Sequence, residues 1–189
     1  GLGKKFFIYG TLFVVLGTPL LWRMLKSYKR ARVLVYLGGG AMTKERYQIE
    51  QAKIAIGSGG VLGKGFLEGT QNKLHFLPEG RTDFIFAVLC EEAGFVGAIV
   101  LILLYIFLFL RLILVAQSIK DPLPKLFAVG LIIPTILSTL INIGMVLGLL
   151  PIVGIPLPFM TCGSSHTWTT FISFGIFMGI AIRRCYING

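Results

Sequence analysis

The stretch Phe76-Leu77-Pro78-Glu79-Gly80-Arg81-Thr82-Asp83-Phe84 joins a long, basic, glycine-rich segment to one of the most apolar runs of the chain. It places acidic and basic side chains where an apolar helix begins, which in a membrane protein is the boundary between water and lipid. A carboxylate at that boundary, close to cations able to hold a phosphate, suits chemistry on a lipid-linked substrate. This stretch therefore favours a membrane enzyme.

Composition indicates the same class of protein. Of the 189 residues, 55% are hydrophobic and 14% are charged, whereas about 25% are charged in soluble domains. A soluble fold of this size could not bury so much apolar surface, so we predict an all-α polytopic membrane protein. The net charge of +10 would suggest nucleic acid binding in a soluble protein. In an apolar chain it indicates loops that contact anionic lipid or phosphate, so we expect membrane lipids and no nucleic acid as partners.

Four apolar segments are long enough to cross a bilayer as helices, which takes about 20 residues each. Glu91 and Glu92 lie near the start of the second segment, which is longer than one span requires. We therefore expect its first two turns at the membrane interface and its lipid-crossing part from Phe95 onward. We predict one membrane domain over residues 1–189, with spans at about 6–22, 84–116, 126–150 and 165–182.

A long loop, residues 23–83, separates the first two predicted spans and holds most of the basic residues. Helical spacing over Arg46–Ile56 predicts a short helix along the membrane surface, which the glycines at 57–60 should end. Short segments weigh more than long loops in the positive-inside rule, so charge alone leaves the orientation open. A second irregular stretch, Pro151–Ser164, should connect the last two spans.

The glycine-rich segment Gly57–Gly65 has the composition of a phosphate-binding loop. It lacks the spacing of the P-loop and of G-x-G-x-x-G, so we do not predict an ATP site. Two interpretations stay open. Backbone N–H groups of the loop approach a phosphate, or the glycines form a purely structural cluster of turns.

Asp83 has two compatible interpretations. Together with Thr82 it can cap the helix that follows. It can also act as a general base at the membrane surface, with Lys73 and Arg81 keeping it ionised. Glu91 lies eight residues further on, about 12 Å of helical rise. The two carboxylates of a hydrolytic pair stand roughly 5–9.5 Å apart, so the spacing does not favour Asp83 and Glu91 as such a pair. A single base suffices when the leaving group is a pyrophosphate, which needs cations rather than a proton donor.

Several polar residues lie inside or beside the apolar segments. Glu91 and Glu92 are costly near lipid unless paired, so we expect ion pairs with cations of the loop. Asn142 should hydrogen-bond to a neighbouring helix. His75 and His166 are isolated and the three cysteines lack CxxC spacing, so we predict no metal site formed by the protein.

Several ordered blocks of the sequence resemble the SEDS family of membrane glycosyltransferases, and its rod-shape-determining RodA branch in particular. The resemblance covers nearly the whole chain and implies the C-terminal part of a fold of roughly ten spans, each long enough to cross the bilayer. The blocks are Gln51–Gly65, Gly69-Thr70-Gln71, Phe76–Glu79, Thr82–Val88, Glu91–Gly97 and Asn142–Met160.

The resemblance implies a peptidoglycan glycosyltransferase that polymerises lipid II for cell elongation and shape, with an undecaprenyl-pyrophosphate leaving group. The family's essential aspartate corresponds to Asp83. It would deprotonate the acceptor hydroxyl as that hydroxyl attacks the donor's anomeric carbon with inversion. A divalent cation, Mg²⁺ or Mn²⁺, would assist the leaving pyrophosphate. The residues that we expect to bind the substrate are Lys64, Gln71, Lys73, Glu79 and Arg81.

The resemblance also implies a class B penicillin-binding protein as partner, a location in the bacterial inner membrane, and a loop 23–83 outside the cytoplasm. The chain begins at Gly1, and we expect spans that precede it to complete the substrate cavity, so that this segment alone is inactive. Two departures from the family pattern are Arg81, where His is usual, and Thr161–His166, where Ser-Tyr-Gly-Gly-Ser-Ser is usual.

Two other functions stay open from the sequence. One is a transporter or flippase of lipid-linked precursors, and the other is a non-catalytic membrane scaffold for a penicillin-binding protein. A transporter should have ionisable residues near the middle of several spans, whereas the predicted spans are nearly free of charge. A scaffold would not require Asp83.

Overall fold

The computed structural model describes Arg23, Arg30, residues 44–69 and residues 82–187. All regular structure in this part of the chain is helical, which confirms the predicted all-α class for these residues. The predicted span at 6–22 lies outside the described residues, as does the segment 70–81. The helices are α3 (Lys44–Gly59), α5 (Ile85–Gln117), α6 (Pro122–Val146) and α7 (Ser164–Ile187).

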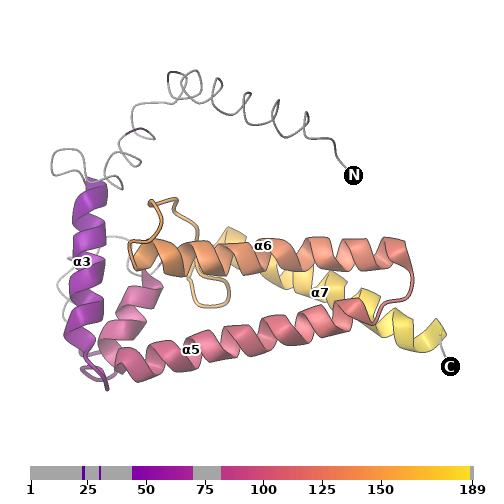
Figure 1. Ribbon diagram of the computed structural model, residues 1–189, viewed down its shortest axis with the longest axis horizontal. Helices are drawn as coiled ribbons and strands as arrows, with labels where there is room; N and C mark the ends of the chain where they lie inside the picture. The colour runs from indigo at the N-terminus through magenta and orange to yellow at the C-terminus, as the bar shows by residue number, and fades with distance from the viewer. Residues whose placement is uncertain (1–22, 24–29, 31–43, 70–81, 188–189) are drawn as a thin grey trace, which may run out of the picture.

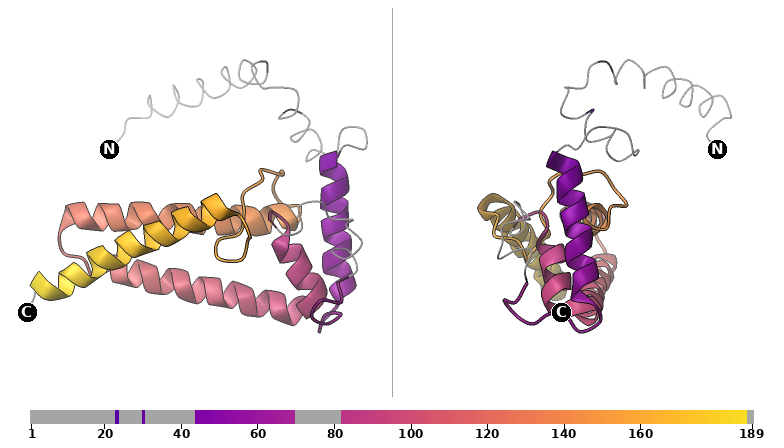
Figure 2. Two further views of the ribbon diagram at one scale, coloured as in Figure 1. Left: turned by 180° about the vertical axis from the view of Figure 1, so that it is seen from behind. Right: turned by 90° about the vertical axis from the view of Figure 1, so that its left-hand side faces the viewer.

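The three long helices α5, α6 and α7 run beside one another in alternating directions, and α3 stands across one end of them (Figure 1). α5 begins at that end and α6 finishes there, and the same end holds the loop 147–163 (Figure 2). Asp83, just before α5, therefore lies where α3 crosses the end of the helix bundle.

α5 changes direction at Gly94, where φ is 67° and ψ is −164°. Essentially only glycine adopts this backbone region. The break divides α5 into a short part, residues 85–93, and a long part, residues 95–117 (Figure 1). It falls one residue before Phe95, where the sequence predicted the change from an interfacial to a lipid-crossing part. The depth of each part in a membrane stays a prediction.

The helix ends differ from the predicted spans by a few residues. α6 begins at Pro122 rather than near residue 126, because proline is well accommodated at the first helical position. It ends at Val146 rather than near residue 150. Gly148 turns the chain with φ +75°, and the N–H groups of Leu149 and Leu150 return to the carbonyl of Gly144 at 2.8 and 3.1 Å.

The other helices agree more closely with the sequence. α3 contains the predicted surface helix Arg46–Ile56 and ends within the glycine cluster, as expected. α7 begins at Ser164 and continues to Ile187, past the predicted end at residue 182. Arginine is a good helix former, so the charges at residues 183 and 184 end the apolar run without ending the helix. The irregular stretch Pro151–Ser164 is confirmed up to its last residue.

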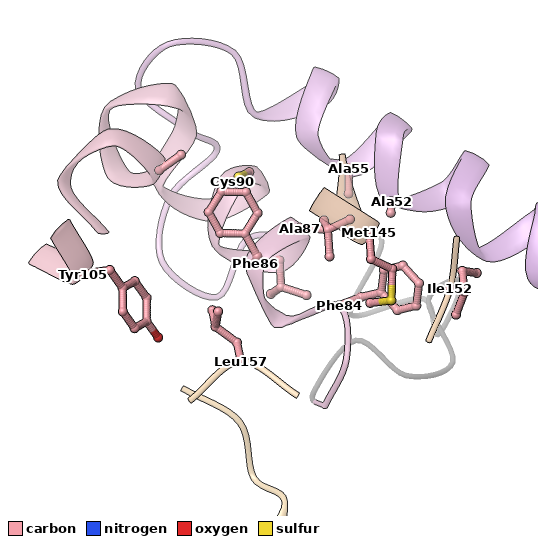
Figure 3. Packing of buried hydrophobic residues seen from close by; sticks show 13 residues of the cluster. Ala52, Ala55, Phe84, Phe86, Ala87, Cys90, Tyr105, Met145, Ile152 and Leu157 are labelled. Atoms are coloured by element: carbon pink, nitrogen blue, oxygen red, sulfur yellow. The ribbon is translucent and has the colours of Figure 1, made fainter. Parts of the chain in front are cut away.

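Buried side chains form one cluster at the α3 end of the bundle (Figure 3). There two fully buried alanines of α3, Ala52 and Ala55, lie against Phe84 and Ala87 at the start of α5 and Met145 of α6. A second cluster lies at the other end, where Leu112, Ile132 and Phe177 come from α5, α6 and α7. The first cluster fixes the element that follows Asp83.

Among the described residues, α5 and α6 are long and apolar enough to cross a membrane. They correspond to the second and third predicted spans, and α7 covers the fourth. Large apolar side chains along these helices are exposed, among them Leu104, Phe107 and Leu140. Contiguous apolar surface of this kind marks a membrane or protein contact. The total of four spans stays a prediction.

Candidate functional site

Asp83 lies in a turn of residues 82–84 and is partly buried. The N-cap position of α5 is Phe84, and no side chain makes a cap hydrogen bond there. Neither Thr82 nor Asp83 is therefore the N-cap residue, because the turn delays the start of α5 until Ile85.

Asn142 holds the main chain of Asp83. It is completely buried near the end of α6, and its Nδ2 donates hydrogen bonds to the carbonyl oxygens of Asp83 at 2.8 Å and Ile155 at 2.7 Å. We expected Asn142 to bond to a neighbouring helix. Its partners are instead a turn and a loop, because α6 ends where these segments meet. Losing one such bond and burying a bare carbonyl costs about 1–3 kcal/mol.

The loop 147–163 forms a wall beside the Asp83 side chain. Gly154 has φ +75°, and a Cβ atom there would stand 3.3 Å from Oδ2 of Asp83. The loop is attached to α6 through Asn142 and to α5 through Tyr105, whose hydroxyl donates a hydrogen bond to the carbonyl of Pro158. Figure 3 shows the Tyr105 hydroxyl directed toward the loop beside Leu157. These two attachments fix the loop relative to Asp83.

Glu91 and Lys64 form a buried ion pair. Glu91 is completely buried, and its Oε1 lies 2.7 Å from Nζ of Lys64, whose side chain is 29% exposed. This confirms the prediction that Glu91 pairs with a loop cation. Removing one partner of a buried ion pair typically costs about 3–5 kcal/mol. The sequence predicted that Lys64 binds substrate. In the structure its ammonium group pairs with a carboxylate of the protein itself, that of Glu91.

The glycine-rich loop uses its backbone N–H groups internally. Gly63 donates to the carbonyl of Gly59 at 2.8 Å, and Lys64 and Gly65 donate to the carbonyls of Glu91 and Glu92, each at 3.0 Å. These three groups point into the protein rather than toward a phosphate. For these three N–H groups, the interpretation of the glycines as a structural cluster of turns therefore holds.

Two of the predicted site residues, Asp83 and Lys64, belong to the described part of the chain, and both lie at the α3 end of the bundle. The other four, Gln71, Lys73, Glu79 and Arg81, lie outside the described residues. Sequence reasoning did not identify Tyr105 or Gly154 as part of this site. A tyrosine within an apolar helix and a glycine in a proline-rich loop gave no distinguishing signal.

The site provides a carboxylate whose main chain is held rigidly at the end of an apolar bundle. Such a group can accept a proton from a bound hydroxyl. No three His, Cys, Asp or Glu side chains come together within residues 44–69 and 82–187 to hold a metal ion.

Comparison with known proteins gives concordant results. The sequence profile of the FtsW/RodA/SpoVE family, described as cell cycle proteins, matches residues 2–186. The peptidoglycan glycosyltransferase MrdB of Escherichia coli K12 is 42% identical over 192 residues, covering 97% of this chain and 50% of that protein. The peptidoglycan glycosyltransferase RodA of Treponema pallidum is 37% identical over 189 residues, covering 96% of this chain and 44% of that protein.

A solved structure has the same fold. It concerns the structural coordination of polymerization and crosslinking by a peptidoglycan synthase complex, and one of its chains superposes with a TM-score of 0.75 at 28% identity. The match covers 97% of this chain and 51% of that chain. This chain thus spans about half the length of the curated relatives it matches. The resemblance to the RodA branch of the SEDS proteins is confirmed: the chain belongs to the FtsW/RodA/SpoVE family.

Proposed function

We propose that the full-length protein is a peptidoglycan glycosyltransferase that polymerises lipid II into glycan strands for cell elongation, with Asp83 as its general base. Relatives named for this activity at 42% and 37% identity support the reaction class. The observation that supports Asp83 most directly is its attachment to the fixed loop 147–163 through Asn142. Proton transfer to a side chain depends on such fixed geometry.

In the proposed reaction, the hydroxyl oxygen of the acceptor sugar attacks the anomeric carbon of the lipid-linked donor. The new C–O bond forms opposite the pyrophosphate, whose bond to that carbon breaks, so the configuration inverts. Asp83 takes the hydroxyl proton, and undecaprenyl-pyrophosphate leaves with the electron pair. The leaving group needs positive charge around it rather than a proton donor. One carboxylate is therefore sufficient.

The positive charge is proposed to come from the loop 23–83. We propose Lys64, Gln71, Lys73, Glu79 and Arg81 as substrate contacts, with the cations on the pyrophosphate and the other two on the sugars. An ammonium has three N–H donors, so the contact of Lys64 with Glu91 is compatible with a phosphate contact. Mg²⁺ is usually held by one or two carboxylates together with substrate phosphates. A Mg²⁺ or Mn²⁺ ion would therefore enter with lipid II, held mainly by its pyrophosphate oxygens, and would supply positive charge to the leaving group.

We further propose that this segment lies in the bacterial inner membrane with four spans, and with residues 23–83 on the outer side. The apolar, exposed surfaces of α5 and α6 support a membrane location. A class B penicillin-binding protein is the proposed partner. The similarity to a chain from a peptidoglycan synthase complex supports this proposal.

Asp83→Asn and Asp83→Ala test the proposal. Each variant of the full-length protein, with its penicillin-binding protein, should lose polymerisation of labelled lipid II while it keeps its expression, melting temperature and partner binding. Glu50→Gln on the exposed surface of α3 is the control and should polymerise normally. Normal polymer from Asp83→Ala would refute the base and favour a scaffold. Loss of lipid II translocation with polymerisation intact would favour a transporter.

A further inference from the structure

The glycine-rich loop fills the break in α5. In a regular helix the N–H groups of Phe95 and Val96 would donate to the carbonyls of Glu91 and Glu92. Here they donate to the loop carbonyls of Gly60 at 3.0 Å and Val61 at 3.1 Å. The loop thus satisfies both donors that the break removes from the helix.

The two freed helix carbonyls are satisfied by the same loop. Glu91 and Glu92 accept hydrogen bonds from the N–H groups of Lys64 and Gly65, each at 3.0 Å. Four bonds to residues 60–65 therefore replace two bonds of α5. A bent α5 with the loop in place and a straight α5 without it are alternative ways to satisfy the same backbone groups.

The close fit of the loop depends on glycine. A Cβ atom on Gly63 would stand 2.1 Å from the carbonyl oxygen of Glu92, and one on Gly94 would stand 2.2 Å from the N atom of Gly63. These contacts are with backbone, which cannot move aside as a flexible side chain can. The loop and the break are thus shaped for each other.

An ion pair of the Glu91 side chain adds to these backbone contacts. Its Oε1 lies 2.7 Å from Nζ of Lys64, and a Cβ atom on Gly69 would stand 3.1 Å from its Oε2. The loop therefore encloses the carboxylate from two sides. Glu91 lies eight residues after Asp83, in the short part of α5 that continues from the Asp83 turn.

We propose that Lys64 and Glu91 are positioning residues, whose ion pair holds the loop 60–69 in the break and so fixes the direction of residues 85–93 and the place of Asp83. The inference rests on the proposed role of Asp83 as the base. Without the ammonium, the buried Glu91 carboxylate is drawn toward water. The loop then leaves the break, and the Asp83 turn shifts with the short part of α5.

A double-variant cycle measures the catalytic consequence in the full-length protein with its partner. Lys64→Met and Glu91→Gln alone should each lower the initial rate at saturating lipid II at least about tenfold, since small misplacements of a catalytic group have such effects. The double variant has no unpaired charge, so its initial rate at saturating lipid II should exceed that of either single variant, while its KM should stay raised because the proposed phosphate contact of Lys64 is lost. The exposed pair Arg46–Glu50, 3.0 Å apart, is the control, and Arg46→Met and Glu50→Gln should change the rate little.

Hydrogen exchange measures the docking of the loop without depending on activity. The amides of residues 64, 65, 95 and 96 should exchange faster in Lys64→Met, and the double variant should restore their protection. Rates that stay at wild-type levels in both single variants would overturn the proposal, as would a double variant no faster than Lys64→Met. If exchange and rate respond as expected while Asp83→Asn still polymerises, the loop does position the site but Asp83 is not its base.

Discussion

Asn142 is bonded to the main chain of Asp83 rather than to its carboxylate: Nδ2 donates to the Asp83 carbonyl at 2.8 Å. The same nitrogen reaches Ile155 in the loop 147–163. One buried amide thus joins the turn before α5 to the loop beside it. The attachment fixes the main chain from which the Asp83 side chain extends, and it uses no carboxylate oxygen. This suits the proposed base, because a base accepts the proton on a carboxylate oxygen.

Replacing Asn142 should therefore affect turnover more than substrate binding. Asn142→Leu removes both hydrogen bonds, and we expect the rate at saturating lipid II to fall about 10- to 100-fold with little change in KM. Asn142→Asp should be worse, because it turns two donors into an acceptor that faces two carbonyl oxygens. Initial rates of lipid II polymerisation over a range of concentrations measure this.

A control on the same helix is available. The Ser138 hydroxyl donates a hydrogen bond to the carbonyl of Pro134 within α6, at 2.8 Å, so Ser138→Ala should keep the wild-type polymerisation rate. If Asn142→Leu raised KM while its rate at saturation stayed normal, the attachment to Asp83 would have no role in turnover.

Gly154 should be intolerant of alanine for two separable reasons. Its φ of +75° is strained for other residues, by about 1–3 kcal/mol. A Cβ atom would also press against Asp83, 3.3 Å from Oδ2. Gly148 is a matched control in the same loop. Its φ is also +75°, but its Cβ would meet the flexible end of Lys53 instead.

Both alanine variants should lose similar stability, seen as a lower melting temperature in detergent. Only Gly154→Ala should lose polymerisation well beyond that shared loss, because only its methyl group meets the Asp83 carboxylate. Equal activity of the two variants would mean that the contact with Asp83 is irrelevant to the reaction.

The sequence predicted the helices well because apolar length and glycine punctuation are local signals. Phe95 was predicted as the start of the lipid-crossing part, and the helix breaks at Gly94. The pairing of Glu91 with a loop cation followed from the cost of a carboxylate near lipid. Asp83 was proposed as the base from its place at a boundary and from family resemblance, and this role stays a prediction.

What the sequence could not provide was the partner of each group across the fold. The glycine loop was compatible with a phosphate until Lys64 and Gly65 were found donating to α5. The N-cap position of α5 falls on Phe84 rather than Asp83 because a turn delays the helix until Ile85, and Asn142 reaches the Asp83 carbonyl across 59 residues of sequence. Such pairings depend on how α5 and α6 meet, which no local pattern encodes.

Tyr105 allows the attachment of the loop to α5 to be tested alone. Its ring is buried and stacks on Phe109 with centroids 5.7 Å apart, and its hydroxyl donates to the carbonyl of Pro158. Tyr105→Phe keeps the ring and removes only the hydroxyl. The buried carbonyl then loses its donor, at a cost of about 1–3 kcal/mol, so both the melting temperature and the polymerisation rate should fall.

Tyr47→Phe on α3, at a side chain that is 37% exposed, is the matched control and should leave both quantities unchanged. The loop is attached at Asn142 as well as at Tyr105, so combining Tyr105→Phe with Asn142→Leu should cost more activity than the two single effects together. Contacts that hold one and the same segment are coupled in this way. Strictly additive losses would show that the two attachments act on independent parts of the protein, and that the loop does not hold Asp83 as one unit.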